Sequence, residues 1–236
     1  MVDPFPPVTK PVIVPTGATS MVLATLDQAA GADAVRKAVT SGFLRPFDIA
    51  RADITAPRPV WVPFWRVQLS VQGLTVDGSH PKVPFVIAAR RAFPFVAKLP
   101  SLGSRLAGKT PFDMMPADTV PADMAVILEN GATILEADVD REDAILAAKD
   151  AFLSGIAPVG LPDRYAPEIE GAAFVLYPVY YATYTYHGEA RRDASDRDFF
   201  VAVSGRTGEL LASTHPSPIR ALAAKLRRAL SFDRRV

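Results

Sequence analysis

The sequence contains no cysteine. This absence excludes disulfide bonds, thiolate catalysis and any cysteine-ligated metal site. Histidine is also scarce, since only His80, His187 and His215 are present, without metal-site spacing or a paired serine nucleophile. Neither a G-x-S-x-G nor an H-E-x-x-H motif occurs. We therefore expect no catalytic residue, no bound metal and no cofactor, and the sequence favours a protein that is not an enzyme.

Long apolar runs are missing as well. A membrane-spanning helix needs about 20 consecutive apolar residues. The longest apolar run, residues 172–182, is interrupted by Pro178 and is rich in tyrosine. The first residues have neither the basic start nor the apolar centre of a secretory signal. The sequence therefore predicts a soluble chain in the cytoplasm.

The composition is that of a globular protein. The chain has 236 residues, of which 49% are hydrophobic and 22% are charged. This length suits one large domain or two small ones. Proline accounts for 22 residues. Because proline interrupts helices and central strands, we expect short and frequently broken elements.

A near-repeat at an offset of 115 residues organises the chain. Residues 59–73 alternate apolar side chains with the polar Arg66, Gln68, Ser70 and Gln72, which is the period of a half-buried strand. Residues 176–188 follow the same plan. The aligned pairs are Pro63 with Pro178, Trp65 with Tyr180, Leu69 with Tyr184, and Gly73 with Gly188. Without a gap, Phe85-Val86 falls on Phe200-Val201, so each half is expected to contain a hairpin.

Tyrosines alternate along the second of these strands, at 180, 184 and 186. A platform for stacking nucleic-acid bases would interleave such rings with arginine or lysine. The intervening residues are alanine and threonine, so we expect the rings to pack in the core.

Helices are expected before each hairpin, around residues 33–39 and 143–149. Asp140 with Asp143 three places on predicts a helix N-cap, and this reading also explains the acidic cluster at 138–143 better than a calcium loop does. Two glycines bracket a polar pair in Ser204–Gly208, which predicts a tight turn.

We therefore predict an α+β protein of two related subdomains, each a helix packed on a small, mainly antiparallel sheet. The first subdomain would occupy residues 1–100 and the second 136–215. A proline-rich connector would join them over 101–135, and a basic amphipathic helix would follow at 216–236.

The C-terminal half carries a recognisable series of motifs. A proline-containing aromatic strand at 177–188 precedes the Gly-x-Thr-Gly turn of 200–209 and then Pro216-Ser217. This series resembles a poorly characterised bacterial family of zinc-ribbon-containing proteins, with a ribbon of the transcription-factor-B type. Residues 60–65 and 136–144 are similar to the upstream segments of that family.

The resemblance implies a function without catalysis. The family has no established enzymatic activity, and its association with membrane-stress gene sets that include phage-shock-type proteins implies an adaptor role at the membrane. Two features depart from the family. The ribbon needs paired cysteines, which this chain lacks, so no zinc is implied. Family members commonly continue into transmembrane helices, whereas this sequence continues into a basic segment.

One segment matches a nucleotide-binding motif. Gly103–Thr110 fits G-x-x-x-x-G-K-[ST], in which Lys109 would reach a terminal phosphate and Thr110 would ligate magnesium. A true P-loop follows a buried strand and opens a long helix. Pro100 before the motif, and Pro111 and Pro116 after it, disfavour both elements. A nucleotide-binding protein therefore stays an alternative.

Charge is distributed unevenly along the chain. The net charge is +1, yet residues 218–236 contain six basic residues and one acidic residue, so that segment carries +5 and the rest −4. Apolar residues recur there with helical spacing at 219, 222, 223, 226 and 230. The basic residues are Arg220, Lys225, Arg227, Arg228, Arg234 and Arg235.

This tail is the leading candidate for a binding site. A basic amphipathic helix can lie on an anionic bilayer, where each basic residue contributes about 1 kcal/mol. The same helix could dock on a protein partner or on its own domain. Together with the resemblance, these features favour a non-enzymatic bacterial adaptor or scaffold that acts at the inner face of the membrane through its tail, or within a protein assembly. Nucleic-acid binding through the tail is a further alternative.

Overall fold

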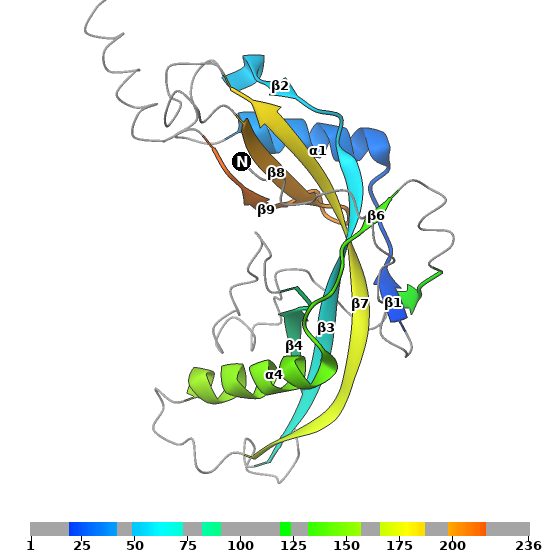
Figure 1. The fold of residues 1–236 in the computed structure, drawn as a ribbon, viewed down its shortest axis with the longest axis vertical. Coiled ribbons are helices and arrows are strands. Elements are labelled where there is room, and N and C mark those ends of the chain that lie inside the picture. The colour runs from blue at the N-terminus through cyan, green and yellow to red at the C-terminus, as the bar shows by residue number, and fades with distance from the viewer. Residues whose placement is uncertain are drawn as a thin grey trace, which may run out of the picture. The chain divides into compact units, whose positions relative to one another are not determined.

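The protein has an α+β fold. The computed structural model describes residues 19–41, 49–72, 82–90, 119–123, 132–156, 166–186 and 198–215. Within these ranges hydrogen bonds join nine strands into a sheet that two α-helices accompany (Figure 1). The helices are α1 (Gln28–Thr40) and α4 (Arg141–Ile156), with one 3-10 turn, η1 (Ile49–Arg51). The strands are β1 (Thr19–Val22), β2 (Asp53–Ile54), β3 (Arg58–Gln72), β4 (Lys82–Ala88), β5 (Thr119–Pro121), β6 (Thr133–Ile134), β7 (Ala166–Thr185), β8 (Asp198–Ser204) and β9 (Leu210–Ser213).

The strands belong to one large sheet rather than to the two small sheets expected, and most of the described pairings are antiparallel. The main path runs β4-β3-β7-β1-β5, and β2 and β8 also pair with β7. Both long strands begin hairpins: β3 pairs antiparallel with β4, and β7 with β8, which β9 then extends. Among the pairings whose register is described, that of β1 with β7 is parallel.

The described residues form two compact units that interleave along the chain. One comprises residues 24–60 and 178–215, and we call it the α1 unit. The other comprises residues 19–23 and 61–177, and we call it the α4 unit. Helix α1 packs on β8 of the second hairpin, whereas α4 packs on β4 of the first. Each unit therefore combines a helix from one half of the sequence with a hairpin from the other half.

The subdomains predicted from the sequence, residues 1–100 and 136–215, are each continuous along the chain, unlike these two units. They describe how the two halves of the sequence correspond, and in that sense they stay a prediction. Two short strands, β5 and β6, lie in the part of the chain expected to be a connector. Residues 101–118 and 124–131 of the expected connector lie outside the described residues.

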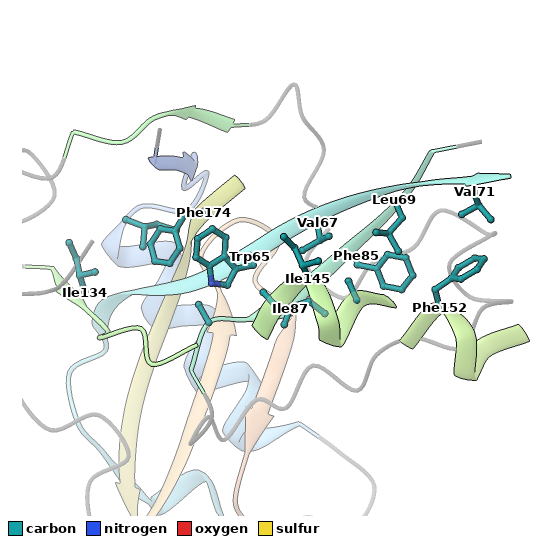
Figure 2. Packing of buried hydrophobic residues seen from close by; sticks show 14 residues of the cluster. Trp65, Val67, Leu69, Val71, Phe85, Ile87, Ile134, Ile145, Phe152 and Phe174 are labelled. Carbon is teal, nitrogen blue, oxygen red and sulfur yellow. The ribbon is translucent and has the colours of Figure 1, made fainter. Parts of the chain in front are cut away.

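The core of the α4 unit lies between α4 and one face of the β3–β4 hairpin (Figure 2). Alternate residues of β3 point toward the helix, and rings stack edge to face at Phe85 and Phe152. Trp65 and Phe174 make a second edge-to-face pair, with ring centroids 5.1 Å apart. The core-facing residues of β3 are Trp65, Val67, Leu69 and Val71, and those of α4 are Ala144, Ile145, Ala148 and Phe152.

The core of the α1 unit has the same plan. Buried residues of α1 at 31, 35, 38 and 39 form the apolar stripe of an amphipathic helix. They face the alternate residues of β7 and β8, namely Tyr180, Ala182, Tyr184, Tyr186, Phe199, Val201 and Val203. The expectation that the tyrosine ladder is core is confirmed.

Both helices begin at an aspartate. Asp140 Oδ1 accepts a hydrogen bond from the Asp143 backbone N–H at 2.7 Å, which confirms the predicted N-cap. Asp27 does the same for α1, since its Oδ1 accepts from the Ala30 N–H at 2.8 Å. The tight turn is confirmed as well: the Gly208 N–H donates to the Ser204 carbonyl at 2.9 Å, and Gly208 has a φ of 71°.

The gapless alignment of the two hairpins is wrong by one residue in the second strand. Trp65 pairs with Ile87, and Tyr180 pairs with Val203, so the first strands correspond at an offset of 115 and the second strands at 116. Phe85 therefore corresponds to Val201 rather than to Phe200. Because neighbouring residues of a strand point to opposite faces, this shift decides which of them enters the core.

A close approach fixes the identity of Gly31 in α1. A Cβ atom at this position would lie 2.5 Å from ring atoms of Tyr180. We expect Gly31→Ala to lower the free energy of unfolding by about 1–3 kcal/mol through overpacking, despite a helix-propensity gain of about 1 kcal/mol. Urea unfolding followed by circular dichroism measures this change. The matched control is Gly171→Ala in β7, where a Cβ would meet nothing within 4 Å. Equal stability of the two variants would contradict the assigned packing.

Candidate functional site

The residues that the sequence singled out for binding lie outside the described residues. This holds for the tail, with Arg220, Lys225, Arg227, Arg228, Arg234 and Arg235, and for the P-loop-like segment Gly103–Thr110. His80 and His187 are outside them too. The polar side chains of the described residues belong to the α1 unit and the α4 unit.

In the α4 unit, polar groups hold the chain where it enters α4. The indole Nε1–H of Trp65 donates to the Val139 carbonyl at 2.8 Å, immediately before the capping Asp140. The backbone N–H groups of Asp138 and Val139 both donate to the Ala89 carbonyl, at 2.9 and 3.1 Å. The Trp65 side chain and the Ala89 carbonyl together tie the helix entrance to the hairpin.

The α1 unit repeats this arrangement with a different side chain. The Tyr180 hydroxyl donates to the Leu26 carbonyl at 3.1 Å, immediately before the capping Asp27. The N–H groups of Thr25 and Leu26 both donate to the Gly205 carbonyl, at 3.2 and 3.0 Å. We call each of these arrangements a helix-entry contact.

The hairpins support both helix-entry contacts in the same way. The Ala89 N–H donates to the Pro63 carbonyl at 3.1 Å, and the Gly205 N–H donates to the Pro178 carbonyl at 2.9 Å. The repeat had aligned these two prolines, and it had also aligned Trp65 with Tyr180. The polar groups of Trp65 and Tyr180 thus both bind main-chain carbonyls, so the role of these two side chains is to stabilise the fold.

The pKa of the Tyr180 phenol is raised in the folded protein. Burial raises the pKa of its phenol above the ordinary value, and the nearby Asp27 carboxylate raises it further. The neutral phenol is therefore the form that the folded protein favours.

A second buried phenol meets a histidine. The Tyr184 hydroxyl lies 3.0 Å from the Thr214 carbonyl and 2.5 Å from Nδ1 of His215. Because a phenol carries one hydrogen, donation to Thr214 leaves its oxygen to accept from the Nδ1–H. The Tyr184 ring also stacks on Phe199, with centroids 5.4 Å apart. His215 thus connects the segment that follows β9 to Tyr184 of β7.

The sheet face opposite α4 is different in character. On β3 it carries Phe64, Arg66, Gln68 and Ser70, which alternate with the core-facing residues. Lys82 stands opposite Ser70 on β4 and forms an ion pair with Glu170 of β7, at 2.8 Å between Nζ and Oε2. We call the side chains of Arg66, Gln68, Ser70 and Lys82 the Arg66 face.

Arg66 is the exceptional member of this face. Its side chain is half-buried, and its Nη1 atom is buried with no hydrogen-bond partner. Phe64, two places along the strand, and Val86, opposite it on β4, are both buried. An unpaired guanidinium beside apolar neighbours is energetically unfavourable.

Sequence reasoning missed Arg66 as a functional candidate. It placed this arginine among the polar residues of a half-buried strand, which would expose it to solvent. The available signal was the setting, because Arg66 lies between Trp65 and Val67 in a strand whose Val60, Val62 and Phe64 are buried on the same side. An arginine enclosed in such a strand needs a partner.

Comparisons with known proteins give no relative for the chain: no family model, no curated protein and no solved structure matches it. Among the described residues, no group of three or more metal-binding side chains gathers at one place. Neither helix in that part of the chain is both long and apolar enough to cross a membrane.

The Tyr180 helix-entry contact can be tested by removing one atom. We expect Tyr180→Phe to lower the free energy of unfolding by about 1 kcal/mol near neutral pH, because the Leu26 carbonyl loses its donor. Wild-type stability should also fall above about pH 10, where the unfolded phenol ionises while the folded one stays neutral. The variant should lack this additional fall.

Urea unfolding at a series of pH values between 7 and 11 measures both effects. Tyr186→Phe, in the same core, serves as the control for general loss of a phenol. A pH dependence unchanged by Tyr180→Phe would contradict the assigned pKa shift.

Proposed function

We propose that the protein is a non-enzymatic adaptor or scaffold that acts at the inner face of a bacterial membrane. The observation that carries this proposal is the segregation of charge and apolar residues in the tail. Residues 218–236 carry +5 on a chain whose remainder carries −4, and the basic residues lie off a helical apolar stripe. This pattern suits a helix lying in the surface of an anionic bilayer.

The use of polar side chains in the two units supports this proposal. Trp65 and Tyr180 bind main-chain carbonyls at the helix entrances, and Asp27 and Asp140 cap the helices. Tyr184 and His215 bind each other. These groups serve the architecture, as expected of a body that presents surfaces rather than one that performs chemistry.

We also propose that the two halves are related repeats. Corresponding residues make the same contacts at both helix entrances, although one is tryptophan and the other tyrosine. A scaffold of this kind would offer two similar units on one chain. The resemblance to zinc-ribbon-containing membrane-associated proteins agrees with such a role, and a cytoplasmic location with peripheral membrane binding follows from it.

Liposome flotation tests the membrane part of the proposal. The full chain should float with vesicles containing anionic lipid and should remain at the bottom with neutral vesicles. Replacing the six basic tail residues by glutamine in the full chain should abolish flotation, because about 1 kcal/mol of attraction is lost at each position. A chain ending at Ser217 should also fail to float.

Controls distinguish membrane binding by the tail from nucleotide binding and nucleic-acid binding. Replacing Arg36, Arg51 and Lys37 of the α1 unit by glutamine removes basic charge outside the tail and should leave flotation intact. Failure of the full chain to float on anionic vesicles would overturn the membrane role. Nucleotide binding abolished by Lys109→Ala, or salt-sensitive binding of DNA by the tail, would then favour the corresponding alternative.

A further inference from the structure

The guanidinium of Arg66 carries a positive charge, and its buried Nη1 atom has no hydrogen-bond partner. Arginine stays protonated at any physiological pH and offers five N–H donors. Among the described residues the Arg66 guanidinium takes part neither in the Lys82–Glu170 ion pair nor in a cation–π contact, and its Nη1 has no hydrogen-bond partner. One of its terminal nitrogens is nevertheless buried. Such an arrangement is costly in the free protein and is explained if a ligand completes it.

The other cation of this face has a counter-charge. Glu170 binds Lys82 at 2.8 Å, which neutralises the second cation of the face. Ser70, which stands opposite Lys82 in the hairpin, is buried. The charge on Arg66 is therefore left without a counter-charge among these residues.

We propose that Arg66 binds the oxyanion of a ligand, a carboxylate or a phosphate group, on the face of the sheet opposite α4. The planar guanidinium can donate two parallel hydrogen bonds to such a group. Phe64 and Val86 supply an apolar surround that strengthens the attraction. Gln68, half-buried two places along β3, adds an amide that can donate to the same ligand. The site lies in the α4 unit.

Thermal unfolding of the full chain tests this site, with inorganic phosphate in one series and acetate in another. Chloride keeps the ionic strength constant. The melting temperature of the wild type should rise with at least one of the two anions, because a ligand that binds only the folded state stabilises it. The series that gives the rise identifies the class of oxyanion. A wild type that neither anion stabilises would overturn the proposal.

Two variants separate binding from structure. Arg66→Lys keeps the charge but loses the two-pronged geometry, so its affinity for the effective anion should fall about tenfold or more. Arg66→Met should abolish the effect of the anion and, in anion-free buffer, should be at least as stable as the wild type, since an unpaired charge has been removed. Lys37→Met, which removes an exposed cation of the α1 unit, should retain the wild-type response.

Two opposite results would contradict the proposal. An Arg66→Met protein that still responds fully to the anion, or that is clearly less stable than the wild type in anion-free buffer, contradicts the proposal. If Arg66→Met fails to fold, Arg66→Lys decides: an undiminished affinity in isothermal titration with the effective anion would count equally against it.

Discussion

The two units depend on satisfying the backbone at the place where each helix begins. A chain that enters a helix beside a buried hairpin carries a carbonyl and several N–H groups out of water, and such groups must find partners. One aromatic side chain meets the carbonyl in each unit, Trp65 at Val139 and Tyr180 at Leu26. The end of the hairpin accepts the two adjacent N–H groups. The following aspartate then caps the helix.

This constraint explains why each unit draws its helix and its hairpin from different halves of the sequence. The partner that satisfies the entrance of α1 lies on β7, and the partner for α4 lies on β3. Each helix is thereby tied to the hairpin from the other half. Strands β3 and β7 contribute residues to both units, so the two halves have to fold in concert. Contacts of such large sequence separation favour slow folding.

The sequence predicted the elements better than their pairing. Periodicity located both helices and both long strands, Asp140 identified a helix start, and the alternation of tyrosines indicated a core face. Those signals are local, because each reflects the chemistry of a few neighbouring residues. The choice of hairpin for each helix is not local. Either hairpin presents an apolar face, so only the three-dimensional packing distinguishes them.

The one-residue error in the second hairpin has a physical origin. A connection between two strands can gain a residue at little energetic cost, and its sequence gives no strong sign of the change. The consequence for the strand that follows is large, because its two faces exchange. Val201 enters the core while Phe200 stacks on Tyr181 with ring centroids 6.0 Å apart. An alignment of apolar residues alone could not choose between these neighbours.

The two units differ on the sheet faces that do not meet the helices. Arg66 and Tyr181 correspond at the offset of 115 that relates Trp65 to Tyr180. In the α1 unit the guanidinium of Arg58 lies 5.4 Å from the centre of the Tyr181 ring, so the cation there rests on an aromatic surface. In the α4 unit the cation is Arg66 itself, and no ring lies beneath it among the described residues. The positions that face the helices pack in the same way in both units. Packing therefore cannot explain why the two cations differ in their surroundings, whereas the proposed ligand of the α4 unit explains it.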